Sequence, residues 1–236
     1  EMVKRTAFAT DADSSRFALG GVLLEMSGED VLAVGTDGRR LARMIGAGKS
    51  VGDHATSGNS TIIPTRSLTL MERAIGDKED VVHIAARNND VLLRTTRCTI
   101  YSRLVEGRYP NWRQVIPSRE GSAIIDMTVG PFFNVIRQAA IVADQETRGL
   151  DMEFGNGTLV LTAKTADLGQ SRVELPIDYD GESIKLKLDY RFVGDFLKVL
   201  PPDAKFKLDV ASGTQPALMT TDDGYAYVVM PMALDG

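Results

Sequence analysis

The sequence predicts an α+β protein made of two tandem domains of one design, each with two helices packed on antiparallel sheets. Two internal similarities lead to this fold class. Residues 3–11 resemble residues 136–144, because each is a helical stretch with a basic residue in the same place. Residues 62–68 likewise resemble residues 186–192, and each segment has the pattern of a strand that runs into a helix. Self-similarity on this scale indicates duplicated domains rather than a solenoid of short repeats.

The predicted elements follow the same order in both copies. The first copy should have a hairpin of strands 17–25 and 31–36. In the second copy, Asn156-Gly157 is a strong hairpin signal between strands 150–154 and 158–163, because both positions tolerate positive φ. Pro64 and Asp189 suit a helix entry and an N-cap. Closing strands are expected at 81–85, 91–95 and 99–104, then at 205–210, 217–221 and 226–230, with the linker near 117–122.

The predicted helices are amphipathic. In the second helix of the first copy, Leu68, Met71 and Ile75 fall on one side, whereas Arg66 and Arg73 fall on another. The second helix of the other copy divides in the same way. A solvated face explains the basic residues of any single helix. Taken together, the helices could also form one basic surface that tracks phosphates without reading bases.

Composition narrows the class of protein. Hydrophobic residues make up 43% of the 236 and charged residues 25%, an ordinary globular balance. The net charge of −5 argues against wholesale coating by nucleic acid but permits a local basic strip. Cys98 is the only cysteine, so no intrachain disulfide can form and a reducing cytoplasm fits. The sequence has no membrane-length apolar run and no signal-peptide pattern.

The sequence offers little support for catalysis. His54 and His83 lack metal-ligand spacing with each other and with Cys98. Residues 46–50 imitate the end of a phosphate-binding loop, but Arg43 stands where the first glycine is required. We expect a flexible loop there, and we expect no catalytic residue, cofactor or metal.

The C-terminal run 226–234 is uncharged and apolar, which is unusual for a chain end. Residues 227–230 have the pattern of a strand that Pro231 ends. The strand could simply close a core. Alternatively, Met230 and Met232 could form the lip of a docking groove, since flexible Met side chains adapt to different partners.

Two segments carry a resemblance to a known family: Thr36-Asp37-Gly38-Arg39-Arg40-Leu41-Ala42 and Tyr227-Val228-Val229-Met230-Pro231-Met232. With residues 104–112 between them, they closely resemble the bacterial DNA polymerase III β subunit, the sliding clamp. The resemblance covers the whole chain in order and corresponds to the second and third of that family's three domains. We therefore expect clamp domains at residues 1–120 and 121–236, with the first domain absent and the N-terminus truncated.

The resemblance implies a non-enzymatic processivity factor, a ring-shaped homodimer around duplex DNA, in the bacterial cytoplasm at the nucleoid. It implies sequence-independent DNA contact through Lys4, Arg16, Arg66, Arg73, Arg137, Arg191 and Lys198. The implied partners are the catalytic subunit of DNA polymerase III, the clamp loader, and other polymerases and repair proteins that carry a motif like Gln-Leu-x-Leu-Phe. The implied peptide pocket comprises Leu19, Thr36, Gly38, Arg39, Arg40, Leu41, Pro110, Val115, Phe192, Val228, Val229, Met230, Pro231 and Met232. The resemblance also implies that Ile141 and Val142, beside an edge strand at 172–175, lie at the subunit interface that closes the ring.

The sequence departs from the family at two positions of the pocket rim. Thr147 stands where well-known members carry an aromatic residue, and Gln114 stands where they carry a basic one. Two other classes remain open on the residues alone. An enzyme of nucleotide metabolism would need residues 46–50 to bind phosphate, and a two-domain scaffold would keep the peptide pocket but not the basic helices.

Overall fold

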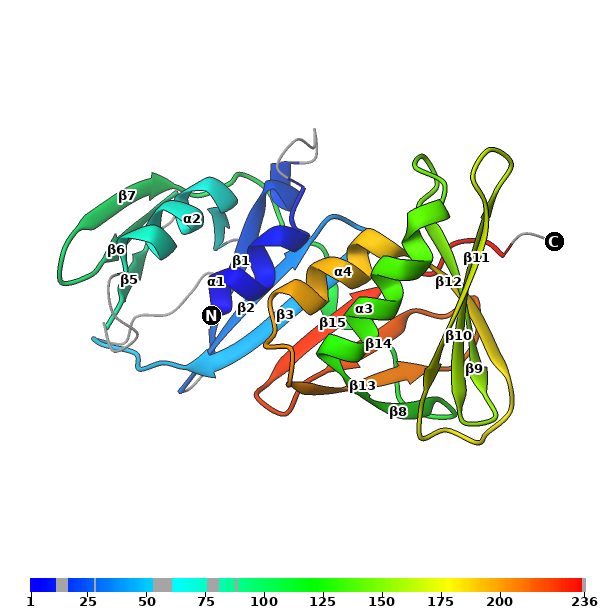
Figure 1. The fold of residues 1–236 in the computed structure, drawn as a ribbon. Helices are drawn as coiled ribbons and strands as arrows, with labels where there is room; N and C mark the ends of the chain where they lie inside the picture. Colours follow the sequence, from blue (N-terminus) through cyan, green and yellow to red (C-terminus); the bar gives the residue numbers. More distant parts are fainter. Residues whose placement is uncertain (12–16, 28, 53–60, 76–80, 88, 235–236) are drawn as a thin grey trace. The chain divides into compact units, whose positions relative to one another are not determined.

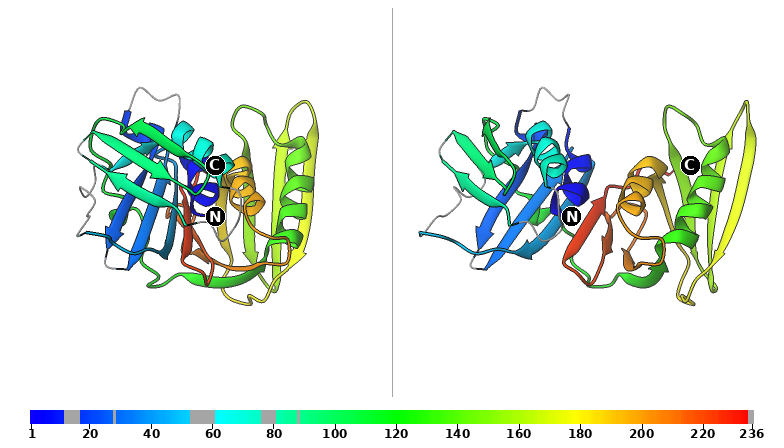
Figure 2. Two further views of the ribbon diagram at one scale, coloured as in Figure 1. Left: turned by 90° about the vertical axis from the view of Figure 1, so that its left-hand side faces the viewer. Right: turned by 60° about the vertical axis from the view of Figure 1, so that its left-hand side comes forward.

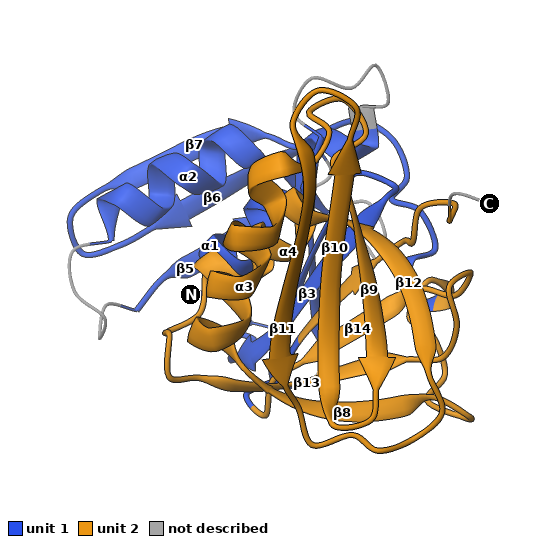
Figure 3. Cartoon of the chain, turned by 45° about the vertical axis from the view of Figure 1, so that its right-hand side comes forward, with its two compact units in different colours: residues 1–113, 223–225 blue, residues 114–222, 226–236 orange. Residues whose placement is uncertain are grey.

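A computed structural model of the chain describes residues 1–11, 17–27, 29–52, 61–75, 81–87 and 89–234 (Figure 1). The chain divides into two compact units. Unit 1 comprises residues 1–113 and 223–225, and unit 2 comprises residues 114–222 and 226–236 (Figure 3). Within the described residues there are four α-helices, and all strand pairings described below are antiparallel. The structure therefore has the α+β class that the sequence predicts.

Unit 1 opens with two short helices and then forms two sheets. Its helical and hairpin elements are α1 (Met2–Thr6), η1 (Ala7–Ala9), η2 (Phe17–Gly20), β1 (Gly21–Ser27), β2 (Asp30–Thr36) and β3 (Arg40–Ala47). They are followed by β4 (Ile62–Pro64), α2 (Thr65–Ala74), β5 (His83–Ala86), β6 (Asp90–Arg94) and β7 (Thr99–Arg103). The strands lie in the orders β4-β1-β2-β3 and β5-β6-β7. Helices α1 and α2 pack against each other and against strands of unit 1 (Figure 2).

Unit 2 repeats this plan with one additional strand. After η4 (Trp112–Gln114), which spans the division, come β8 (Ala123–Thr128), α3 (Val129–Ala139), η5 (Ala140–Val142), β9 (Gly149–Gly155), β10 (Thr158–Thr165) and β11 (Gly169–Pro176). The unit ends with β12 (Ile184–Asp189), α4 (Tyr190–Lys198), β13 (Lys205–Val210), β14 (Ala217–Thr220) and β15 (Tyr225–Val229). The strand orders are β11-β10-β9-β12 and β15-β14-β13-β8.

Local sequence signals account for several element boundaries. Asn156 and Gly157 have φ of 50° and 71°, as a tight hairpin turn between β9 and β10 requires. Asp189 is the N-cap of α4, and its carboxylate accepts a 2.8 Å hydrogen bond from the backbone N–H of Arg191. Pro64 is the last residue of β4 and the N-cap of α2. These predictions are confirmed.

Apolar helix faces and strand faces form the core of each unit. In unit 1, Leu68 and Met71 of α2 pack with Val22 and Ile63 of the adjacent strands. In unit 2, the Phe206 ring lies 6.0 Å from that of Phe132 and 5.3 Å from that of Phe196. Burial of these side chains is the main favourable term holding each helix on its sheet.

Two predictions from the sequence are wrong. Residues 17–20 form η2 rather than the start of a strand, because their carbonyls bond elsewhere: Leu19 accepts from the backbone N–H of Asp11, and Gly20 accepts from the Thr65 hydroxyl. Gly46 and Ala47 lie in β3, paired with Val31 and Asp30, rather than in a loop. Strands β3 and β8 were not among the elements predicted from the sequence.

Candidate functional sites

All four helices present basic side chains to solvent. Lys4 on α1, Arg66 and Arg73 on α2, Arg137 on α3, and Arg191 and Lys198 on α4 are exposed. The four helices together carry seven Lys or Arg residues and only two Asp or Glu residues, although the whole chain has 27 basic and 32 acidic side chains. The acidic excess therefore lies outside the helices. Arg16 lies outside the described residues.

Two neighbouring basic residues on α1 differ in burial. Lys4 is exposed, whereas Arg5 is 7% exposed. The Arg5 guanidinium lies 2.6 Å from the Asp223 carboxylate and 5.2 Å from the centre of the Tyr225 ring, all within unit 1. Arg5 is thus committed to the fold, and only Lys4 on this helix can meet a phosphate.

The segment 36–41 is a tight turn organised by Asp37. One Asp37 carboxylate oxygen accepts from the backbone N–H groups of Arg39 and Arg40, at 2.9 and 3.0 Å. The other oxygen accepts from Arg40 Nε at 3.0 Å. The Thr36 hydroxyl donates to the Arg40 carbonyl at 2.6 Å and accepts from the Gly38 N–H at 3.1 Å. The turn therefore holds Gly38 and Arg39 outward as exposed residues.

Two predicted peptide-binding residues in this turn have a structural role. Arg40 also donates to the Phe8 carbonyl at 2.9 Å and lies over the Phe8 ring at 5.4 Å, so it braces the turn against η1. Gly38 has φ of +89°, and a Cβ there would meet no atom within 4 Å. Glycine is favoured at position 38 because the turn requires a positive φ there, not because a side chain would clash. Leu41 is 1% exposed and Leu19 is 6% exposed.

The segment 104–113 is anchored by Tyr109. Its buried hydroxyl donates to the Val34 carbonyl at 2.9 Å, and burial raises the pKa of this phenol. Trp112, 4% exposed, lies under the Arg113 guanidinium at 4.3 Å. Arg113 in turn donates to the Glu25 carboxylate at 2.6 Å. These contacts fix the backbone on both sides of Pro110, which is exposed.

The C-terminal segment divides into a buried strand and a half-open end. Val228 and Val229 in β15 are fully buried, so their side chains belong to the core. Met230 is 42% exposed, and Pro231 and Met232 are half-buried. The Met232 N–H donates to the Lys187 carbonyl at 2.8 Å, which ties the end of the chain to β12.

Phe192 and Val115 complete the predicted pocket residues on unit 2. Phe192 is half-buried on α4, and its carbonyl accepts a 3.0 Å hydrogen bond from the Tyr227 hydroxyl. The Tyr227 ring stacks on Phe196 at 5.3 Å. Val115 is 39% exposed. Thr147 and Gln114, which the resemblance places at the pocket rim, are both exposed.

The residues expected at a ring interface lie at one edge of unit 2. Ile141 in η5 is 74% exposed and Val142 is half-buried. Strand β11 ends its four-stranded sheet, and the Ser171 hydroxyl donates to the Ala139 carbonyl at 2.8 Å, which ties the last residue of α3, directly before η5, to that strand.

The described residues provide no metal-binding constellation. Among them, no group of three or more His, Cys, Asp or Glu side chains could hold a metal ion. His54 lies outside the described residues, and His83 is an exposed residue of β5. No helix in the described part of the chain is long and apolar enough to cross a membrane.

Asp37, Tyr109 and Arg5 hold the backbone of the candidate sites in place, and none of them was predicted from the sequence as a site residue. Asp37 is followed at once by glycine, a common turn signal that could have identified it. Tyr109 and Arg5 carry no such signal, because their partners lie 75 and 218 residues away in the sequence.

Two units with the same order of hairpin, strand-to-helix and closing strands, each exposing basic helices, define a protein of duplicated α+β domains. The family model for the central domain of the DNA polymerase III beta subunit matches residues 1–111, and the model for its C-terminal domain matches residues 113–233. The chain therefore belongs to the DNA polymerase III beta subunit family.

Known proteins of this family are similar to the chain over almost all of its length. The beta sliding clamp of Pseudomonas putida is 27% identical over 235 residues, which cover 99% of this chain and 63% of the relative. That of Chlamydia trachomatis is 28% identical, with 99% and 55% covered. The crystal structure of the subunit from Pseudomonas aeruginosa superposes with a TM-score of 0.91 at 25% identity, covering 99% of this chain and 63% of the other. Another structure, of the Pseudomonas aeruginosa clamp bound to griselimycin, has the same TM-score. The chain thus spans less than two thirds of these relatives.

Proposed function

We propose that this chain supplies two domains of a DNA sliding clamp, a non-catalytic processivity factor that encircles duplex DNA and tethers a replicative polymerase. The observation that carries this proposal is the exposure of Lys or Arg on each of the four described α-helices, in a chain whose net charge is −5. Membership in the beta subunit family supports it. We assign residues 1–120 and 121–236 to the two clamp domains, working in the bacterial cytoplasm at the nucleoid.

DNA contact should be weak and independent of base sequence, because tight binding would stop sliding. Each helix exposes only one or two cations, and Lys198 is already 3.0 Å from Asp195. Such contacts reach phosphates and release counterions, so binding should weaken steeply as salt rises, with a log–log slope of about −0.9 for each phosphate engaged.

The experiment compares charge-neutral substitutions on and off the helices. Arg66→Gln and Arg137→Gln should each make the salt slope shallower by roughly one contact. Arg172→Gln is the matched control, since Arg172 is an exposed arginine on β11 paired with Glu174 at 2.8 Å. Equal slopes for all three variants, or a strong preference for one base sequence, would refute the DNA-facing assignment.

We further propose that the chain binds a short peptide like Gln-Leu-x-Leu-Phe through the predicted peptide-binding residues. Such a motif would be carried by the polymerase III catalytic subunit, the clamp loader and other polymerases and repair proteins. The organised turn at 36–41, the anchored Pro110 and the half-open Met230–Met232 end support this, with apolar side chains available for Leu and Phe anchors. A related clamp binds griselimycin. Affinity should be about micromolar, because a short segment loses entropy on binding.

Fluorescence anisotropy with a labelled peptide tests this binding mode. Removing residues 230–236 should abolish binding, and Met230→Ala or Met232→Ala should weaken it. Leu234→Ala is the control, because Leu234 is 47% exposed against 42% for Met230 and lies four positions further on. Unchanged peptide binding by the truncated chain would refute the proposed peptide site but would not affect the proposed DNA contact.

We also propose that Ile141, Val142 and the β11 edge at 172–175 form one side of a head-to-tail ring contact and meet a different surface of a partner subunit. Heterologous contacts of this kind need two complementary surfaces. The exposure of Ile141 and the edge position of β11 support this placement. The chain by itself should then be mainly monomeric in dilute solution.

A further inference from the structure

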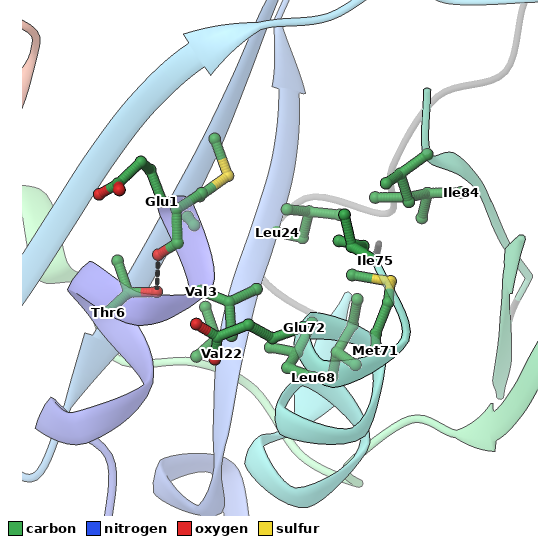
Figure 4. Close-up of a pocket in the computed structure, with 14 residues that line it drawn as sticks. Glu1, Val3, Thr6, Val22, Leu24, Leu68, Met71, Glu72, Ile75 and Ile84 are labelled. Atoms are coloured by element: carbon green, nitrogen blue, oxygen red, sulfur yellow. Dashed lines mark hydrogen bonds between the residues drawn. The ribbon is translucent and has the colours of Figure 1, made fainter. Parts of the chain in front are cut away.

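The three-stranded sheet β5-β6-β7 of unit 1 has two different faces. One face packs on the core: Ile84 of β5, with Met71 of α2 and Ile75 directly after it, lines an apolar pocket beneath the sheet (Figure 4). Val91 and Leu93 of β6 belong to the core cluster of the same unit and are 0% and 1% exposed. Because successive side chains of a strand point to opposite faces, the residues between them point away from this core.

The strand register places the outward side chains in three rows that cross β5, β6 and β7. The middle row is exposed and carries no charge, and it consists of Ala85, Leu92 and Tyr101. The neighbouring rows lie two residues along each strand, which is about 7 Å away. Arg94 belongs to one of these rows and Arg103 to the other, and both are exposed. The outward face therefore has an uncharged strip with a cation on each side of it.

Charge on this face is strongly one-sided. Segment 81–103 has four arginines and no lysine, and all four are exposed: Arg87, Arg94, Arg97 and Arg103. Asp90 is the only acidic residue of the segment. The corresponding strands of unit 2 lie in residues 205–229, which contain two lysines and three aspartates. The duplicated fold thus does not require a basic face here, and the excess charge favours an anionic partner.

Tyr101 lies in the middle of this basic face. It is 63% exposed, and its hydroxyl donates to the Asp90 carboxylate at 3.3 Å. Asp90 is on the neighbouring strand, one row away from Tyr101, so this hydrogen bond directs the ring along the sheet rather than straight out into solvent. A ring that is so exposed and so oriented can stack on a flat group that lies on the sheet.

We propose that the outward face of β5-β6-β7 binds single-stranded nucleic acid. An unpaired base stacks on Tyr101, and the phosphates on either side of that base pair with Arg94 and Arg103. Aromatic rings accept bases of any sequence, while the surrounding cations follow the sugar-phosphate backbone. Arginine suits this task because its guanidinium binds phosphate through two hydrogen bonds and stacks on flat groups.

The ring and the arginines together separate this ligand from its alternatives. A duplex keeps its bases stacked on one another, so it would contact the arginines without using Tyr101. An acidic peptide would likewise meet the arginines and would have no need of an open ring between them. None of these residues lies on the four helices, so the proposal goes beyond the duplex contact proposed above and does not rest on it.

Fluorescence anisotropy can compare two labelled strands of about twelve nucleotides, oligothymidylate and an abasic strand of equal length and charge. The parent chain should bind oligothymidylate about fivefold or more tightly than the abasic strand, because only the former can stack. Tyr101→Ala should abolish this preference, whereas Tyr101→Phe should keep it because the ring remains. Equal affinities of the parent chain for the two strands, or a preference that Tyr101→Ala retains, would overturn the proposal.

The salt dependence of oligothymidylate binding tests the arginines separately. Arg94→Gln and Arg103→Gln should each make the log–log slope shallower by about 0.7, the value for one phosphate of a single strand. Lys207→Gln is the control, because Lys207 is an exposed cation on β13, in the corresponding sheet of unit 2, and its slope should match that of the parent chain.

Two further results would place the ligand elsewhere or change its class. A slope that responds to Arg66→Gln on α2 but to neither Arg94→Gln nor Arg103→Gln would assign single strands to the helices and refute this site. Such a result would leave the duplex contact intact. An oligoglutamate of equal charge that binds as tightly as oligothymidylate, and depends on Arg94 and Arg103 but not on Tyr101, would identify an acidic-peptide surface and overturn the proposal.

Discussion

The turn at residues 36–41 allows a quantitative test, because one carboxylate holds most of it. Asp37 accepts from two backbone N–H groups and from the Arg40 guanidinium. The side chains of Arg40 and Asp37 are 11% and 16% exposed, so solvent screens their ion pair little. Replacing Asp37 by Ala leaves a half-buried Arg40 without this acceptor, although it keeps the Phe8 carbonyl.

The loss of stability caused by Asp37→Ala can be estimated from the groups that lose their hydrogen-bond partner. The Arg39 N–H is exposed and can turn to water, so its loss costs little. The charge-assisted bond from Arg40 Nε is worth about 1.5–3 kcal/mol, and the bond from the Arg40 N–H about 1 kcal/mol. Asp37→Ala should therefore destabilise unit 1 by about 3 kcal/mol. Asp37→Asn keeps an oxygen for the backbone N–H groups and should cost about half as much.

Urea unfolding followed by Trp112 fluorescence measures both variants, and peptide anisotropy measures the consequence for binding. Asp37→Ala should weaken peptide binding even under conditions where unit 1 is fully folded, because Gly38 and Arg39 lose their position. Asp90→Ala is a suitable control, since the Asp90 carboxylate accepts an exposed bond from Tyr101 at 3.3 Å. A loss below about 0.5 kcal/mol for Asp37→Ala, or equal losses for Ala and Asn, would refute the reasoning.

Three further predictions follow from buried or exposed single groups. Tyr109→Phe removes the hydroxyl that donates to Val34 and should cost unit 1 about 1–2 kcal/mol by Trp112 fluorescence; no loss would show that this bond does not anchor 104–113. Burial raises the pKa of Asp189, so its charge costs stability at pH 7, and that cost is relieved as pH falls through the folded-state pKa toward the unfolded value near 4. Asp189→Asn keeps the cap, so its free energy of unfolding should exceed that of the parent chain most at pH 7 and less near pH 4, as measured by circular dichroism. Asp189→Ala loses the cap and should lower the free energy of unfolding by about 1 kcal/mol. A difference between Asp189→Asn and the parent chain that does not change with pH would contradict this. Ile141→Ser should leave stability unchanged but reduce self-association at high concentration in sedimentation velocity, and a tight dimer in both chains would be the contrary result.

Much of the local structure was predictable from short stretches of sequence. The Asn156-Gly157 turn, the cap at Asp189 and the strand-to-helix passages at Pro64 and Asp189 depend on residues within a few positions of each other. The amphipathic pattern likewise predicts that Arg66 and Arg73 face solvent while Leu68 and Met71 are buried, as they are. Local backbone preferences and side-chain periodicity are sufficient for such features.

The tertiary structure decided which side chains of a predicted site are free to act. Lys4 and Arg5 are adjacent and equally basic, but only the structure shows that Arg5 is held by Asp223. The resemblance implies that Arg40, Val228 and Val229 belong to a binding surface, and only the structure shows that Arg40 donates to the Phe8 carbonyl and that both valines are fully buried. Residues 17–20 have a strand-like sequence, but their carbonyls bond Asp11 and Thr65. In each case the deciding partner is distant in sequence or lies outside the local pattern, so the chain must fold before the contact exists.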